Sequence, residues 1–206
     1  MTQVLLTCGA VGPLLFIAVF LIEGALRPGY RPWRHYVSLL ELGDRGWIQR
    51  ASFVVCGSLT VAFAIGVARA LDSVAVPGLF AIFGVALIVS GWFATDPALG
   101  YPPGTATTWP PVTSRHGNIH NLAGLFVFVS LPAACFVVAY ASHGAWMIYS
   151  IVTGIVMPVC FVATGALAER TARGQASDPP VGIAQRLSIV SGWTWLALVA
   201  LHLALA

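Results

Sequence analysis

The segment SRHGNIHNLAGLFVFVSLPAACFVVAY, residues 114–140, sets two histidines, His116 and His120, at the start of a long apolar run. The run from Leu122 to Tyr140 has about the length of 20 residues that a helix needs to cross a bilayer. A spacing of four residues places both imidazoles on one face of that helix, one turn apart. The segment therefore predicts a membrane-spanning helix that begins in a polar cluster.

The rest of the chain contains five more apolar runs of similar length. Of 206 residues, 58% are hydrophobic and only 8% are charged, against roughly 25% charged residues in soluble domains. The runs are continuous rather than alternating, which favours helices over strands. We therefore expect an all-α polytopic membrane protein. It forms a single six-transmembrane-helix domain over residues 1–206, with approximate helices at 4–25, 51–71, 77–94, 118–140, 145–168 and 187–206.

The connections between the expected helices are unequal in length. Those at 26–50, 95–117 and 169–186 are long, whereas those at 72–76 and 141–144 are tight turns. In an up-and-down bundle the long loops 1-2, 3-4 and 5-6 emerge on one face and cap it. Nine of the ten arginines fall on that face. The positive-inside rule assigns it to the cytoplasm, with both termini outside.

Arginines in these loops are candidate ligands for an anion. Arg31, Arg34 and Arg45 in the first long loop are donors whose planar fork matches phosphate or carboxylate. Arg115, next to His116, adds a further cation. The stretch HYVSLLELG, residues 35–43, is compatible with a short helix lying in the membrane interface.

Two acids lie on the same side of the membrane as the histidines. Asp96 directly follows the third apolar run, and Glu23 lies near the end of the first. An acid within the bilayer is costly and tends to face the bundle interior. His116, His120 and Asp96 would form a zinc site with an open position for water, and Glu23 would be its base. The alternative is structural, with the imidazoles hydrogen-bonded to these acids or to loop carbonyls.

Other sites and classes are disfavoured. His202 and His143 lie too far from the cluster, the first about 24 Å along the last helix from its cap end and the second in a turn on the opposite face. Haem ligands usually come from two facing helices. No nucleotide-binding or hydrolase motif is present, and the arginines face a membrane rather than forming a nucleic-acid fold.

A family resemblance covers nearly the whole chain. PGYRPWRHYVSLLELG, FATDPALGYPPG and RHGNIHNLAG resemble successive motifs of the bacterial membrane family catalogued as domain of unknown function 998. That family is distantly similar to the six-helix Frag1/DRAM/Sfk1 membrane proteins, whose termini are cytoplasmic, so sidedness stays open. The resemblance implies a six-helix fold and no activity. It puts functional weight on Arg27, Tyr30, Ser38, Asp96, His116 and His120.

The expected protein is a multi-pass protein of the bacterial inner membrane with a polar pocket at one face. We expect it to bind a lipid or an amphipathic small molecule, and no nucleic acid. A metal-dependent intramembrane hydrolase or transferase that uses zinc is the alternative. The ligand, the oligomeric state and the presence of a metal are open. The expected ligand-binding residues are Arg27, Tyr30, Arg31, Arg34, Ser38 and Arg115; the expected catalytic residues are Glu23 and Asp96; the expected metal ligands are His116, His120 and Asp96.

Overall fold

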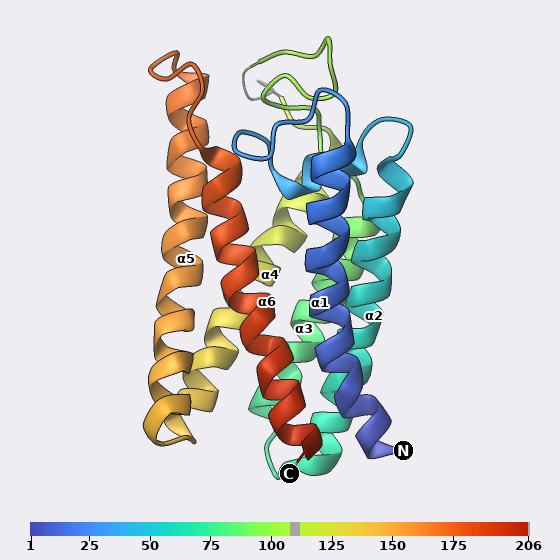
Figure 1. Cartoon of the computed structure of the whole chain (residues 1–206), viewed down its shortest axis with the longest axis vertical. Coiled ribbons are helices and arrows are strands. Elements are labelled where there is room, and N and C mark those ends of the chain that lie inside the picture. Colours follow the sequence, from blue (N-terminus) through green and yellow to red (C-terminus); the bar gives the residue numbers. More distant parts are fainter. Residues whose placement is uncertain (108–111, 206) are drawn as a thin grey trace.

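Six helices run up and down through the computed structural model, which describes residues 1–107 and 112–205 (Figure 1). All six are long and apolar enough to cross a membrane. The expected all-α architecture of a multi-pass membrane protein is therefore confirmed. The helices are α1 (Thr2–Leu26), α2 (Gly46–Ala70), α3 (Ala75–Trp92), α4 (Arg115–Tyr140), α5 (Gly144–Ala172) and α6 (Val181–Leu205), with a short 3-10 helix, η1 (Val37–Glu41), between α1 and α2.

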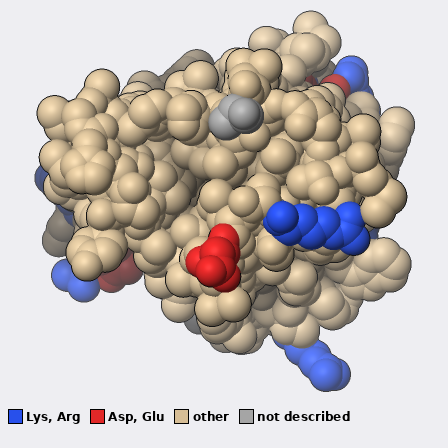
Figure 2. Space-filling model, turned by 90° about the horizontal axis from the view of Figure 1, so that it is seen from below, with Lys and Arg blue, Asp and Glu red and all other residues tan. Residues whose placement is uncertain are grey.

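The helices form a closed ring in chain order. Each packs against its neighbours in sequence, and α6 packs against α1. The three long loops lie together at one end of the bundle, and both termini lie at the other end with the two short turns (Figure 1). We call the first the cap end and the second the terminal end. The terminal end carries only a few charged side chains (Figure 2), in keeping with the expectation that nine of the ten arginines lie on the face with the long loops.

Three helices extend by four or more residues beyond the apolar runs that predict them. Helix α2 begins at Gly46, α5 continues to Ala172 and α6 begins at Val181. The apolar run marks only the part of a helix that faces lipid, whereas these extra turns pack against loops at the cap end. Two prolines, Pro179 and Pro180, directly precede α6, where proline favours a helix start. Ala206, which the apolar run includes, lies outside the described residues.

Glycines allow α2 and α3 to approach each other closely. A Cβ atom on Gly57 would lie 2.6 Å from the backbone oxygen of Gly84, and one on Gly84 would lie 2.7 Å from that of Gly57. Any side chain at either position would push the two helices apart. Small residues at such a crossing are typical of membrane helices, whose association depends on close packing.

A layer of aromatic rings fills the middle of the bundle. The indole of Trp193 on α6 lies 5.7 Å from the Phe16 ring of α1, 4.8 Å from the Phe83 ring of α3 and 6.3 Å from the Phe128 ring of α4, measured between centroids. Rings at these distances add attraction beyond the area they bury. Side chains from four helices thus meet at one level, below the cap.

The helix η1 is inserted into the mouth of the bundle. Val37, Leu39 and Leu40 are all buried, and the Val37 N–H donates to Gln185 Oε1 of α6 at 2.7 Å. The sequence predicts a short helix at this point, lying in the membrane interface. The structure has a 3-10 helix there, and its packing against α1, α2 and α6 removes its apolar side chains from water.

Candidate functional site

Arg34 joins all three long loops of the cap. Its Nε donates to the Leu99 backbone oxygen at 3.1 Å and its Nη2 to that of Thr107 at 3.2 Å, both in loop 3-4. Its Nη1 donates to Asp178 Oδ1 in loop 5-6 at 2.9 Å, and also to the Ser177 backbone oxygen. The planar guanidinium reaches several acceptors at once. Arg34 is therefore a structural centre of the cap rather than a free cation.

Arg27 and Glu23 form a second buried centre, where α1 enters the cap. Arg27 Nη2 lies 2.7 Å from Glu23 Oε2, and both side chains are 5% exposed. Arg27 also donates to the backbone oxygens of Leu42 at 2.9 Å and Arg45 at 3.1 Å. Glu23 pairs in addition with the Arg45 side chain. The sequence prediction that Glu23 faces the interior fits this geometry, but its partners are arginines rather than histidines.

Tyr30 and Arg186 link the first loop to α6. The Tyr30 hydroxyl donates to the backbone oxygen of Tyr36 at 2.9 Å and accepts a hydrogen bond from Arg186 Nη2. Arg186 Nη1 donates to the backbone oxygen of His35 at 3.0 Å. Burial raises the pKa of Tyr30 to about 12, so the phenol stays protonated at neutral pH.

His35 is buried in the cap and is fully bonded. Its Nδ1 accepts from the Arg31 backbone N–H at 3.0 Å, and its Nε2 lies 3.1 Å from the Leu99 backbone oxygen. Since a carbonyl only accepts, Nε2 carries the proton and Nδ1 is the acceptor. The pKa of His35 is lowered to about 4, and burial of the ring is the largest cause of this shift. The ring is therefore neutral at physiological pH.

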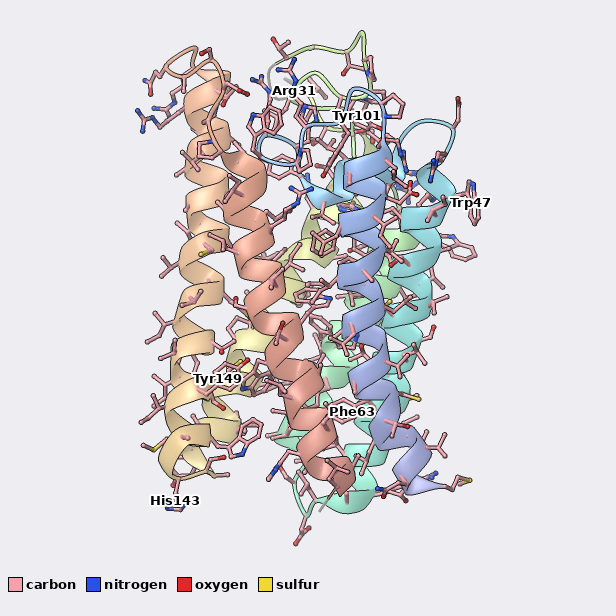
Figure 3. The ribbon with its side chains drawn as sticks, in the orientation of Figure 1. Arg31, Trp47, Phe63, Tyr101, His143 and Tyr149 are labelled. Atoms are coloured by element: carbon pink, nitrogen blue, oxygen red, sulfur yellow. The ribbon has the colours of Figure 1, made fainter. Side chains whose placement is uncertain are left out.

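The expected ligand-binding residues thus separate into two groups. Arg27, Tyr30 and Arg34 are buried and hold the cap loops together. Arg31 and Arg115 are exposed and form no ion pair within the described part of the chain. Figure 3 shows Arg31 and Tyr101 among the cap loops and His143 at the terminal end. The exclusion of His143 from the polar cluster agrees with this position.

A pocket of about 370 Å³ lies inside the bundle directly below η1. Its upper part is lined by polar side chains, and its lower part is aromatic and aliphatic. Ser38, the remaining expected ligand-binding residue, is one of the upper group. The polar lining comprises Tyr36, Ser38, Ser90, Thr95, His120, Asn121, Thr164 and Gln185; the apolar lining includes Phe16, Phe53, Leu87, Val127, Phe128, Phe161, Ile189 and Trp193.

The pocket opens sideways between α4 and α5. The rings of Phe128 and Phe161 stack at 4.2 Å and close the seam between these helices halfway along the bundle. On the cap side of this pair, Asn121, Val162 and Gly165 line the pocket and are also exposed on the outer surface. These residues make the seam between α4 and α5 the side on which the pocket lining reaches the outer surface of the bundle.

His120 holds one edge of its ring against the end of α3. Its Nδ1 lies 2.9 Å from the Phe93 backbone oxygen and 3.1 Å from that of Ser90. Both oxygens only accept, so Nδ1 carries the proton and Nε2 is an acceptor in the neutral ring. Nε2 has no hydrogen-bond partner among the described residues, and the ring borders the pocket. The partners are carbonyls at the end of α3, whereas the structural alternative expects Asp96, Glu23 or loop carbonyls.

Glu41 of η1 stands behind His120 and was not among the expected site residues. Its Oε2 accepts from the Thr95 backbone N–H at 3.1 Å and lies 3.4 Å from His120 Nδ1. Its Oε1 is buried without a partner in the described structure. Burial raises the pKa of Glu41 well above its ordinary value, against the opposing hydrogen bond from Thr95 and the charge of Arg50. The sequence signal was an acid within the apolar stretch SLLEL.

Asp96 shapes the start of α4. Its Oδ2 accepts from the Ser114 backbone N–H at 2.8 Å, and the Ser114 hydroxyl caps the helix by accepting from the Gly117 N–H at 3.0 Å. A Cβ atom on Gly117 would lie 2.0 Å from Asp96 Oδ2, so this approach requires glycine. His116 is exposed, and its ring meets that of Phe93 edge-on at 5.3 Å.

The zinc hypothesis requires His116, His120 and Asp96 to converge on one point. Instead, His120 Nδ1 faces the end of α3, His116 lies on the surface and Asp96 binds the start of α4. Within residues 1–107 and 112–205, no group of three or more histidine, cysteine or acidic side chains is arranged to hold a metal ion. The described residues therefore do not fit a zinc site. The zinc site rests on the sequence pattern alone.

Comparison with known proteins identifies a family. The model of the family described as "Protein of unknown function (DUF998)" matches residues 10–202. No curated protein and no solved structure matches the chain.

Proposed function

The chain belongs to the DUF998 family of proteins of unknown function, and we propose that it binds an amphipathic molecule in the pocket below η1. The observation that carries the proposal is the division of the pocket into a polar and an apolar part. On α4 the lining changes from His120 to Phe128, and on α6 from Gln185 to Trp193. Eight residues of helix correspond to about 12 Å, which is long enough to separate a head from part of a tail.

The pocket has the size and shape of a ligand site. Its volume of about 370 Å³ is within the range of roughly 300–1,000 Å³ for small-molecule sites, which are mostly apolar with a few placed polar groups. The mouth between α4 and α5 faces the membrane, where amphipathic molecules are concentrated. A tail that extends through this mouth remains in lipid, so the ligand is not limited to the pocket volume.

The cap fixes the upper wall of this site. Arg34, Arg27 and Arg186 bond the loops to one another and to α6, which holds η1 and Ser38 over the pocket. Arg27 and Arg34 are among the residues that the sequence analysis expects to bind a ligand. In this proposal they act on the ligand only through the position of η1.

We further propose that the protein resides in the bacterial inner membrane with its cap in the cytoplasm. Support comes from the arginines that are not needed for the bonds just described. Without Arg27, Arg34 and Arg186, six arginines still lie at the cap end, whereas Arg69 is the one at the terminal end. Six arginines at the cap end against one at the terminal end favour a cytoplasmic position for the cap.

Photolabelling tests the binding proposal. The probes are three hexadecyl chains with a mid-chain diazirine that carry a hydroxyl, a phosphate or a trimethylammonium head. At least one is expected to label the pocket-facing residues of α4 and α5, as mapped by mass spectrometry. Gly124→Phe is expected to abolish this labelling, since Gly124 lines the pocket and a Cβ there meets no atom within 4 Å.

The control for this experiment is Gly78→Phe. Gly78 is also a helical glycine whose Cβ would meet no atom within 4 Å, but it is on α3 at the terminal end and does not line the pocket. Labelling of the pocket is expected to survive this change. If no probe labels the pocket, or if both variants label like the wild type, the proposal fails.

A further inference from the structure

Among the described residues, no charged side chain lines the head end of the pocket. None of the described lining residues is an arginine, aspartate or glutamate. The nearest cap arginines are engaged elsewhere: Arg186 bonds to loop carbonyls and Tyr30, and Arg34 bonds to loops 3-4 and 5-6. A phosphate, carboxylate or ammonium head would therefore enter an apolar space without a counter-ion, which is strongly unfavourable.

His120 supplies a fixed acceptor at this end. Its proton is held on Nδ1 by the carbonyls of Phe93 and Ser90, so the lone pair of Nε2 is on the edge of the ring away from α3. Glu41 reinforces this tautomer, because its Oε2 lies 3.4 Å from Nδ1. The raised pKa of Glu41 favours the uncharged acid, which adds no charge beside the head.

Gln185 supplies a donor at the same level. Its Oε1 accepts from the Val37 N–H at 2.7 Å, which fixes the orientation of the amide and leaves its NH₂ group without a partner among the described residues. Ser38, next to Val37, adds a hydroxyl that both donates and accepts. The polar lining therefore offers neutral donors together with one oriented acceptor.

On the basis of the function proposed above, we infer that the ligand is a neutral lipid with a hydroxyl head, which donates its hydrogen bond to Nε2 of His120. A hydroxyl both donates and accepts, so it matches the acceptor on His120 and the donor on Gln185. An ester, ether or ketone head has no proton to give to Nε2. An ionised head has no counter-ion in the lining.

The test compares heads on one chain in the wild-type protein. The photoactivatable hexadecanol labels the pocket, and unlabelled hexadecanol, hexadecyl methyl ether and hexadecyl phosphate compete. Hexadecanol is expected to compete best. The ether, which lacks the donor, and the phosphate, which is charged, are each expected to be weaker by about tenfold or more, the factor for about one hydrogen bond.

Two substitutions extend the test to the protein. His120→Phe removes the acceptor and is expected to abolish the preference for the alcohol over the ether, while His143→Phe, at an exposed histidine of the terminal end that does not line the pocket, preserves it. Equal competition by alcohol and ether in the wild type overturns the role of His120, even if His120→Phe does not fold. Stronger competition by the phosphate overturns the neutral head. Either result leaves pocket labelling, and hence the proposed function, intact.

Discussion

Arg34 Nη1 lies 2.9 Å from Asp178 Oδ1, an ion pair that joins the first long loop to the third across 144 residues of sequence. The same guanidinium bonds to loop 3-4 through the backbone oxygens of Leu99 and Thr107. One side chain thus unites the cap, and η1 keeps its position over the pocket because the loops around it are fixed.

Arg34→Lys is expected to destabilise the cap. A lysine ammonium keeps the charge near Asp178 but lacks the planar fork that reaches Leu99 and Thr107. The expected loss is about 2–3 kcal/mol in the free energy of unfolding, the order of one or two charged hydrogen bonds. Thermal unfolding in detergent measures it. Arg31→Lys, in the same loop and exposed, is the control and is expected to change little; equal losses in both variants would contradict the assigned role.

Glu23→Gln and Arg45→Gln are expected to differ although they break the same ion pair. The first leaves the buried Arg27 guanidinium without its carboxylate, which costs about 3–5 kcal/mol for a buried pair. In the second, Glu23 keeps Arg27, and the lost partner is a side chain that is 46% exposed, so the cost is about 0–1 kcal/mol. Chemical unfolding of both variants provides the comparison. A larger loss for Arg45→Gln would show that the pairing is misassigned.

Acid is expected to weaken the cap through His35. The pKa of His35 is lowered from 6.5 to about 4 in the folded protein, so the unfolded chain binds the proton more readily. The contribution of His35 is complete above pH 6.5 and is lost as the pH falls towards 4. At pH 5 the loss is about 2 kcal/mol by linkage.

The variant His35→Gln isolates this effect. Glutamine keeps one donor and one acceptor but does not titrate. The measurement is the difference in unfolding free energy between wild type and variant as a function of pH. This difference is expected to shrink between pH 6.5 and 4 as the wild type loses stability. A difference that stays constant over this range would rule out His35 as the titrating group.

The sidedness of the protein is expected to follow the arginines, with the cap in the cytoplasm. Single cysteines introduced as Arg45→Cys and His143→Cys, after the four native cysteines are changed to alanine, report it. In intact spheroplasts a membrane-impermeant maleimide is expected to label position 143 and to reach position 45 only after lysis. The reverse pattern would place the cap outside and remove the support for a cytoplasmic cap.

Part of the candidate site was accessible from the sequence. His120 was expected at the polar start of a helix beneath a loop cap, and the structure has it there, lining the pocket. Its neighbour His116 differs by one helical turn and is exposed. The spacing of four places His116 and His120 on one face of α4. At His120 this face is buried in the bundle, and one turn earlier, at His116, it is exposed. Sequence spacing alone does not tell which end of the face is buried.

Glu41 illustrates the opposite case. In the sequence it is one acid in a loop, with three leucines beside it. Its burial against His120 arises because η1 turns into the bundle, and that turn depends on the seat formed by three other helices. The acid within the apolar stretch SLLEL is a local signal, but no local pattern encodes such a seat, so the sequence does not show that Glu41 lies against His120.

The sequence by itself determined the six membrane spans and the collection of the long loops at one end. Both follow from local quantities, namely the length of each apolar run against the thickness of a bilayer and the alternation of helix direction. The tertiary structure decided which arginines are used within the cap, where Glu41 lies and that a pocket opens between α4 and α5. These depend on backbone carbonyls brought together from distant loops and on two helices that part above the stacked rings of Phe128 and Phe161. Such contacts have no local signature in the chain.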